Sequence, residues 1–76
     1  MTPIVGVQCW LARATLGWST RRLALAAGVS QHTVQRFERG VALKAITVEA
    51  IQDALEKAGV VFVGRDDGGP GARLRR

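Results

Sequence analysis

Residues 20–39, TRRLALAAGVSQHTVQRFER, decide the fold of this chain. Apolar residues recur through this stretch at helical spacing, and Gly28 interrupts the pattern. Glycine adopts the left-handed backbone of a sharp turn without steric cost, and Ala24 is small where two helices would cross closely. The stretch therefore predicts two short amphipathic helices joined by a tight turn. Their inward side chains are Leu23, Ala27, Val29, Val34 and Phe37.

The second of these helices has a polar outer face. At 100° per residue its outward and flanking positions hold Gln31, His32, Gln35 and Arg36. Glutamine can pair with the edge of adenine and arginine with that of guanine, whereas a solvated face more usually carries Glu and Lys. Two helices joined in this way form a helix-turn-helix, which places its second helix in the major groove of DNA. The alternative is a pair of ordinary core helices in a bundle.

Charge is divided unevenly along the chain. The formal net charge is +5 over 76 residues, and the isoelectric point of about 11.2 indicates an anionic partner. Between residues 19 and 44 the single acid is Glu38, whereas the next helical segment carries Glu49, Asp53 and Glu56. This division places the positive field around the helix-turn-helix.

Two adjacent arginines lie where a helix dipole disfavours them. Arg21 and Arg22 fall in the first turn of the helix over residues 20–27, at a cost of roughly 0.3–1 kcal/mol each. A DNA phosphate at this N-terminus, with Ser19 and Thr20 supplying hydroxyls and backbone N–H groups, would account for both. The alternative is that the two arginines are solvated surface residues.

Two opposite charges fall on apolar helix faces. Arg13 lies within the stripe of Cys9, Ala12 and Leu16, and Glu38 lies beside the apolar side of its own helix. An isolated buried charge costs several kcal/mol, so we expect the two to meet as a structural ion pair. Cys9 itself is expected to be a small core residue.

The remaining segments complete a mainly α chain. The predicted helices span residues 5–16, 20–27, 31–39 and 48–58. Their expected side-chain N-caps, where the sequence offers one, are Ser19, Ser30 and Thr47. The β-branched and aromatic run at residues 60–63 predicts a strand, and a second, poorer strand follows the turn-rich segment 64–71.

Several classes of protein are not expected. One cysteine excludes an internal disulfide framework, and the single histidine, His32, has no second ligand type near it, so we expect no metal site and no cofactor. No nucleophile has an adjacent base, and Asp66 and Asp67 are expected in a solvated turn, so we expect no enzyme. Without an apolar span or a secretory signal, the default location is cytoplasmic, at the nucleoid if DNA is the partner.

The stretch ARATLGWSTRRLALAAGVSQHTVQRFERG, residues 12–40, resembles the lambda-repressor-like, Xre-type helix-turn-helix regulators. The resemblance extends more loosely through the fourth helix and EKAGVVFV, and the tail GGPGARLR is similar to that of small bacterial regulators. It implies about four short helices in residues 1–59 as a DNA-binding domain, with a strand or hairpin and a basic tail in residues 60–76. By family analogy the protein would be a repressor that binds a short palindromic operator as a homodimer.

The resemblance also implies roles for particular residues. Base contacts would come from Gln31, His32, Gln35 and Arg36. With the two helix-start arginines included, the expected phosphate contacts are Ser19, Thr20, Arg21, Arg22, Thr33, Arg39 and Lys44. The family often pairs an arginine of its first helix with a glutamate that ends its third, which agrees with Arg13 and Glu38. Two positions depart from the family pattern: Arg22 replaces a glutamate that would complete a capping box with Ser19, and Trp10 replaces a polar residue.

A dimer would need an interface, and the sequence suggests one in the C-terminal part. Val60, Val61, Phe62 and Val63 form a strand that is apolar on both faces, and it should pair with its own kind or pack on a helix. Trp10 is expected near that interface or against the hairpin. The competing interpretation is an antitoxin-like interaction subunit that holds a partner protein through this strand. Whether the purified chain alone shifts a specific DNA distinguishes the two.

Overall fold

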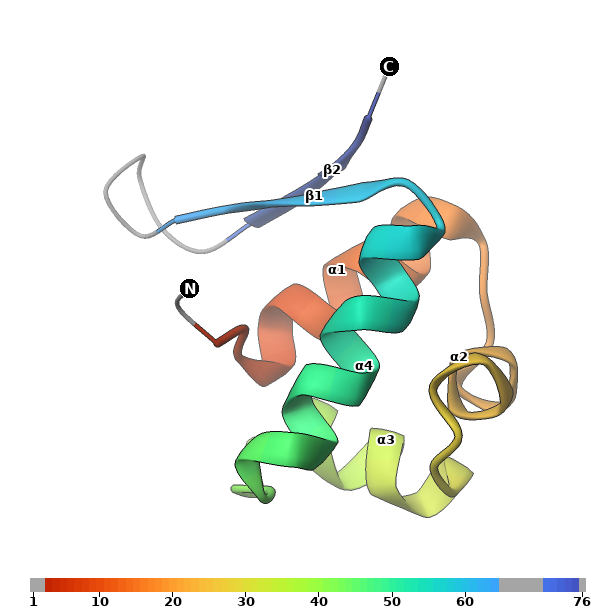
Figure 1. Ribbon diagram of the computed structural model, residues 1–76, viewed down its shortest axis with the longest axis vertical. Coiled ribbons are helices and arrows are strands. Elements are labelled where there is room, and N and C mark those ends of the chain that lie inside the picture. The colour runs from red at the N-terminus through yellow and green to blue at the C-terminus, as the bar shows by residue number, and fades with distance from the viewer. Residues whose placement is uncertain (1–2, 65–70, 76) are drawn as a thin grey trace.

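The computed structural model describes residues 3–64 and 71–75, and in these the chain forms four helices followed by a two-stranded antiparallel hairpin (Figure 1). The elements are α1 (Gly6–Leu16), α2 (Thr20–Ala27), α3 (Gln31–Glu38), α4 (Ala45–Lys57), β1 (Val60–Val63) and β2 (Gly71–Leu74). The mainly α fold predicted from the sequence is confirmed. The predicted turn with Asp66 and Asp67 lies outside the described residues.

The helix-turn-helix is built from local signals that the sequence carries. Ser19 and Ser30 cap α2 and α3, because their side chains accept hydrogen bonds from the backbone N–H groups of Arg22 and Thr33, both at 3.0 Å. Between the helices Gly28 has a φ of 72°, in the left-handed region that favours glycine. The start of α2 therefore keeps the serine half of a capping box, while Arg22 occupies the position of the missing glutamate.

The start of α4 differs from the sequence prediction. The helix begins at Ala45 with Lys44 as its N-cap residue, and Thr47 already lies in the first turn. The Lys44 carbonyl accepts the N–H groups of Thr47 at 3.0 Å and Val48 at 3.1 Å. The prediction that Thr47 caps this helix was wrong, because no side chain caps it at all. A threonine near a helix start favours the N-cap position but does not impose it, and here the first backbone hydrogen bonds set the boundary at Lys44.

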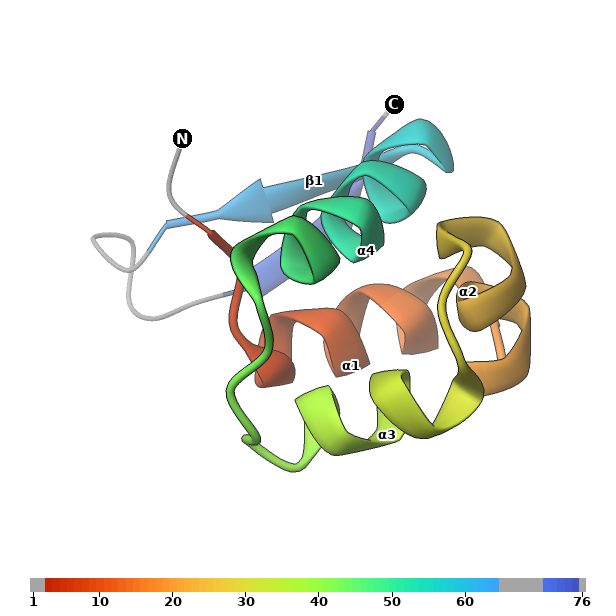
Figure 2. The same cartoon turned by 60° about the horizontal axis from the view of Figure 1, so that its bottom comes forward.

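The core lies where α1, α2, α3 and α4 meet, and its largest fully buried side chains include Leu23, Val34, Ile51 and Leu55. The hairpin closes one side of it, with β2 packed along α1 and Val60 of β1 only 2% exposed. Figures 1 and 2 both show the hairpin and α3 on opposite sides of the α1 and α4 layer. Val60 is thus a core residue of its own protomer, in line with the expectation that this strand packs on a helix, and the expected dimer interface at residues 60–63 stays a prediction.

Candidate nucleic-acid interface

The outer face of α3 is the first part of the candidate interface. Gln31, His32, Gln35 and Arg36 are all exposed, whereas Val34 is fully buried and Phe37 nearly so. In Figure 2 this helix lies at the lower edge of the molecule, with α1 directly above it on the side of the core. The four side chains proposed to read bases therefore share one accessible surface, on a helix whose other side is anchored in the core.

The side chain of Gln31 is held by a neighbour. Its Nε2 donates a hydrogen bond of 2.9 Å to Oγ1 of Thr20, the first residue of α2. This bond joins the N-termini of α2 and α3. The amide oxygen of Gln31 can still accept a hydrogen bond from an external donor. The sequence placed these residues in separate roles, one on bases and one on phosphate, but in the structure they form one unit.

Arg21 and Arg22 have different surroundings at the start of α2. The guanidinium of Arg22 lies over the ring of Trp18, 5.0 Å from its centroid, which is a favourable cation–π distance. Arg21 is exposed and has no ion pair with any described residue. Stacking uses the face of the Arg22 guanidinium and leaves its edge N–H groups able to donate. Both arginines therefore remain able to contact a phosphate, with Arg22 held in one position.

A cleft of about 490 Å³ lies between α3 and the start of α4. Ser30, Thr33 and Arg36 line it from the start and outer side of α3, and Lys44 and Thr47 line it from the start of α4. No side chain caps the N-terminus of α4, and Arg36 and Lys44 bring two cations to the cleft beside it. Such a helix terminus suits an anion. Sequence reasoning missed this cleft because it placed the helix start three residues too late.

The other residues expected to contact phosphate are exposed or partly exposed. Arg39 is exposed at the C-terminus of α3 and forms no ion pair among the described residues. Thr33 shares a 2.8 Å hydrogen bond with the Ser30 hydroxyl, so the two oxygens form a local pair at the start of α3. Ser19 is exposed, and its oxygen already accepts the capping bond, which leaves its O–H free to donate outward.

An ion pair fixes α3 against α1. Arg13 donates from Nε and Nη2 to the two carboxylate oxygens of Glu38, each at 2.9 Å, and from Nη1 to the carbonyl of Trp18 at 3.0 Å. The side chains are 18% and 10% exposed. These hydrogen bonds raise the pKa of Arg13, so the guanidinium stays charged. The pair links α1, the α1–α2 connection and the end of α3.

Cys9 lies beneath this pair as a fully buried residue. Its Sγ donates a hydrogen bond of 3.4 Å to the Glu38 carboxylate. Burial raises the pKa of the Cys9 thiol far above its usual range, and the nearby negative charge of Glu38 adds to the effect. The thiol therefore stays protonated and serves as a packing group, as expected from the sequence.

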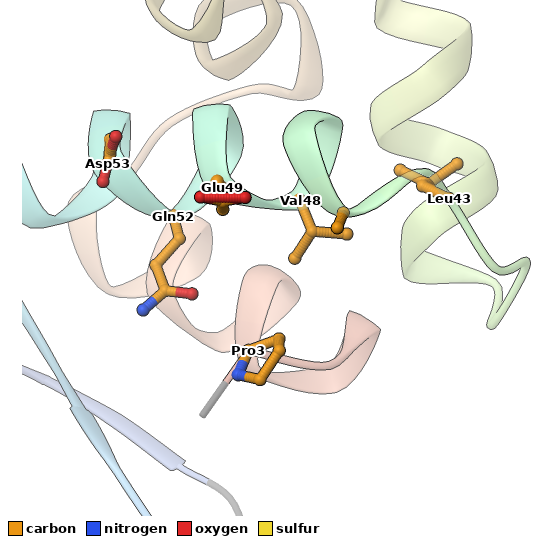
Figure 3. Close-up of a pocket in the computed structure, with 7 residues that line it drawn as sticks. Pro3, Leu43, Val48, Glu49, Gln52 and Asp53 are labelled. Carbon is orange, nitrogen blue, oxygen red and sulfur yellow. The ribbon is translucent and has the colours of Figure 1, made fainter. Parts of the chain in front are cut away.

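The outer side of α4 has the opposite charge. Glu49 and Asp53 are exposed and line, with Pro3, Val48 and Gln52, a hollow of about 600 Å³ (Figure 3). In the described part of the chain neither carboxylate takes part in an ion pair. Acidic side chains repel phosphates, so this side of the molecule does not suit DNA.

The model of a family described as Helix-turn-helix matches residues 11–60, from within α1 to the first residue of β1. A search of curated proteins found no match. In the described residues no helix has both the length and the apolar character needed to span a bilayer.

Proposed function

The chain belongs to the lambda-repressor-like, Xre-type helix-turn-helix family of DNA-binding transcription regulators, and on that premise we propose that it is a repressor. It binds a short palindromic operator as a homodimer and blocks transcription by occupying that site. The observation that carries the proposal is the exposed face of α3, with four side chains able to meet base edges. Exposed arginines at the start of α2 and the end of α3 flank this face, and Glu49 and Asp53 of α4, which form no ion pair among the described residues, line a different hollow.

Selection of bound duplexes from a random library with the purified chain tests this function. We expect one enriched motif made of two inverted half-sites about one helical turn apart. An enriched motif without inverted symmetry would contradict the homodimer. Failure of the chain alone to bind any duplex would contradict the function and favour the interaction-subunit interpretation. The regulatory sign is then measured with the selected site overlapping a promoter, where a repressor lowers the transcript level.

Base readout is proposed for Arg36 and Gln31. Arg36→Ala should cost about 1–3 kcal/mol of binding free energy at one base position and relax the preference there. Gln31→Ala should do the same at a different position. Affinities for the selected site, for its single-base variants and for random DNA measure both effects.

The matched control for this prediction is Lys57→Ala. Lys57 is exposed near the end of α4 and also carries one positive charge. Its removal should leave the base preferences unchanged. An Arg36 variant that loses the same factor on specific and random duplexes would show that this side chain contacts the phosphate backbone and reads no base.

Phosphate contact is proposed for Arg21 and Arg22. Each neutralised phosphate releases counterions, so Arg21→Ala and Arg22→Ala should each weaken binding to all sequences. Each should also lower the slope of log affinity against log salt by about 1. Titrations at four or more salt concentrations, with Lys57→Ala as control, measure the slope. An unchanged slope in both variants would show that Arg21 and Arg22 are solvated surface residues. If Arg22→Ala lowers the stability of the protein but not its DNA affinity, the role of Arg22 is to pack on Trp18.

A further inference from the structure

The first helix is apolar on the side that faces solvent. Among residues 6–16 the one charged side chain is Arg13, and it turns toward Glu38. Val7, Trp10 and Ala14 follow one another at helical spacing on the exposed side, with Val7 49% and Trp10 50% exposed. The solvent side of a helix normally carries polar residues, whereas Thr15 is the one polar residue among the exposed residues of α1. One side of α1 therefore lacks a cover within the protomer.

The strand next to α1 also carries an exposed apolar side chain. Strand β2 packs along α1, and Leu74 at its end is 43% exposed. Alternation along the strand puts Leu74 on the same side as Ala72, which packs against the core. We define Val7, Trp10, Leu11, Ala14 and Leu74 as the α1 face. An isolated exposed apolar side chain is ordinary, but several on one helix and its neighbouring strand mark a contact surface.

We propose that a second copy of this chain covers the α1 face. The first argument is charge. Two copies that met through α2 and α3 would bring together Arg21, Arg22, Arg36 and Arg39, and two that met through α4 would bring together Glu49 and Asp53. Both arrangements juxtapose like charges. The four helix residues of the α1 face carry no charge, so these positions can meet their own copy without that repulsion, and the exposed Arg73 and Arg75 lie beside Leu74 at the strand end of the face.

The second argument is the place of this face in the fold. The hairpin and α3 lie at opposite ends of the molecule, and in Figure 1 α4 lies in front of α1. The exposed side of α1 is the side away from the core, so it is lateral to both ends. A two-fold axis beside this face turns both α3 helices toward the same side, as one duplex requires. A dimer formed through the far side of the hairpin would point them apart.

The size of the face sets the strength of the contact. The exposed half of Trp10 offers roughly 100 Å², and the exposed parts of Val7 and Leu74 add roughly 50 Å² each. The total of about 200 Å² of apolar area is well below the ~800 Å² per partner of a standard stable interface. We therefore expect a weak dimer in free solution that forms fully when adjacent half-sites hold two copies together. This inference rests on the proposed binding to a paired operator and specifies the surface that makes it cooperative.

The test places a charge at the centre of the face in the full chain. Trp10→Glu should abolish concentration-dependent self-association in sedimentation, whereas Ile46→Glu, a change at a residue 74% exposed on α4, should keep it. On DNA, Trp10→Glu should bind a single half-site as the wild type does and lose at least tenfold on the paired site. Ala14→Glu provides a second variant, and thermal unfolding identifies which variants fold.

The outcomes separate this inference from the function it rests on. A wild-type chain that binds no duplex but loses self-association on Trp10→Glu would keep the interface and overturn the operator. Folded Trp10→Glu and Ala14→Glu variants that associate as the wild type does would overturn the α1 face. A wild-type chain that remains monomeric and binds paired sites without cooperativity would overturn it as well. Deletion of residues 60–76 would not test the α1 face, because it also removes the core residue Val60.

Discussion

Glu38→Ala is expected to lower the free energy of unfolding by about 3–5 kcal/mol, the usual cost of removing one partner of a buried ion pair. The carboxylate of Glu38 accepts both Arg13 hydrogen bonds and the Cys9 thiol. Without it Arg13 keeps only its bond to the Trp18 carbonyl, and a charge that is 18% exposed is left without a counterion. For a domain of this size with about 5 kcal/mol of total stability, that loss leaves a large unfolded fraction.

Denaturant unfolding monitored by circular dichroism measures this effect, with Glu49→Ala as the matched control. Glu49 is an exposed acid without an ion pair in the described residues, so its removal should change stability by less than about 0.5 kcal/mol. The double change Arg13→Met with Glu38→Leu should recover much of the loss, because apolar residues of similar volume can replace a buried pair. Native-like unfolding of Glu38→Ala would mean that water already screens the two charges.

Features that depend on neighbouring residues were predictable from the sequence. The bounds of α2, the caps Ser19 and Ser30, and the left-handed Gly28 each follow from residues within one turn of the feature they explain. The meeting of Arg13 with Glu38 joins distant segments, yet it was predictable because burying either charge alone is too costly. The exposed face of α3 followed from helical periodicity once the helix itself was identified.

Features that depend on how elements pack were not predictable in the same way. The sequence shows that residues 60–63 are apolar, but not that α4 is the helix that packs on this strand or that Val60 is the residue that becomes buried. The start of α4 was misplaced because a threonine attracts a capping prediction while the backbone begins the helix at Ala45. The stacking of Arg22 on Trp18 likewise requires the turn geometry at Gly17, whose φ is 70°.

Gly6 is the clearest residue that sequence reasoning passed over, since a glycine at the start of a helix has no distinctive pattern. A Cβ built there would overlap the carbonyl oxygen of Phe37, and it would lie 3.2 Å from the Phe37 carbonyl carbon and 3.3 Å from Cα of Glu38. All three atoms belong to the backbone at the end of α3, so no side-chain rotation can make room. Without a side chain at Gly6, α1 approaches the end of α3 closely, and Arg13 of α1 reaches Glu38 of α3.

Gly6→Ala is therefore expected to destabilise the protein by about 2–3 kcal/mol. Alanine favours a helix over glycine by up to about 1 kcal/mol, but overpacking commonly costs about 1–3 kcal/mol and more where the backbone must move. The clash should prevail and lower Tm by about 4–8 °C for each kcal/mol. Gly64→Ala is the matched control, because a Cβ at Gly64 meets no atom within 4 Å. If Gly6→Ala has the same Tm as the wild type, α1 and α3 can separate without cost, and their close approach does not set the position of α3.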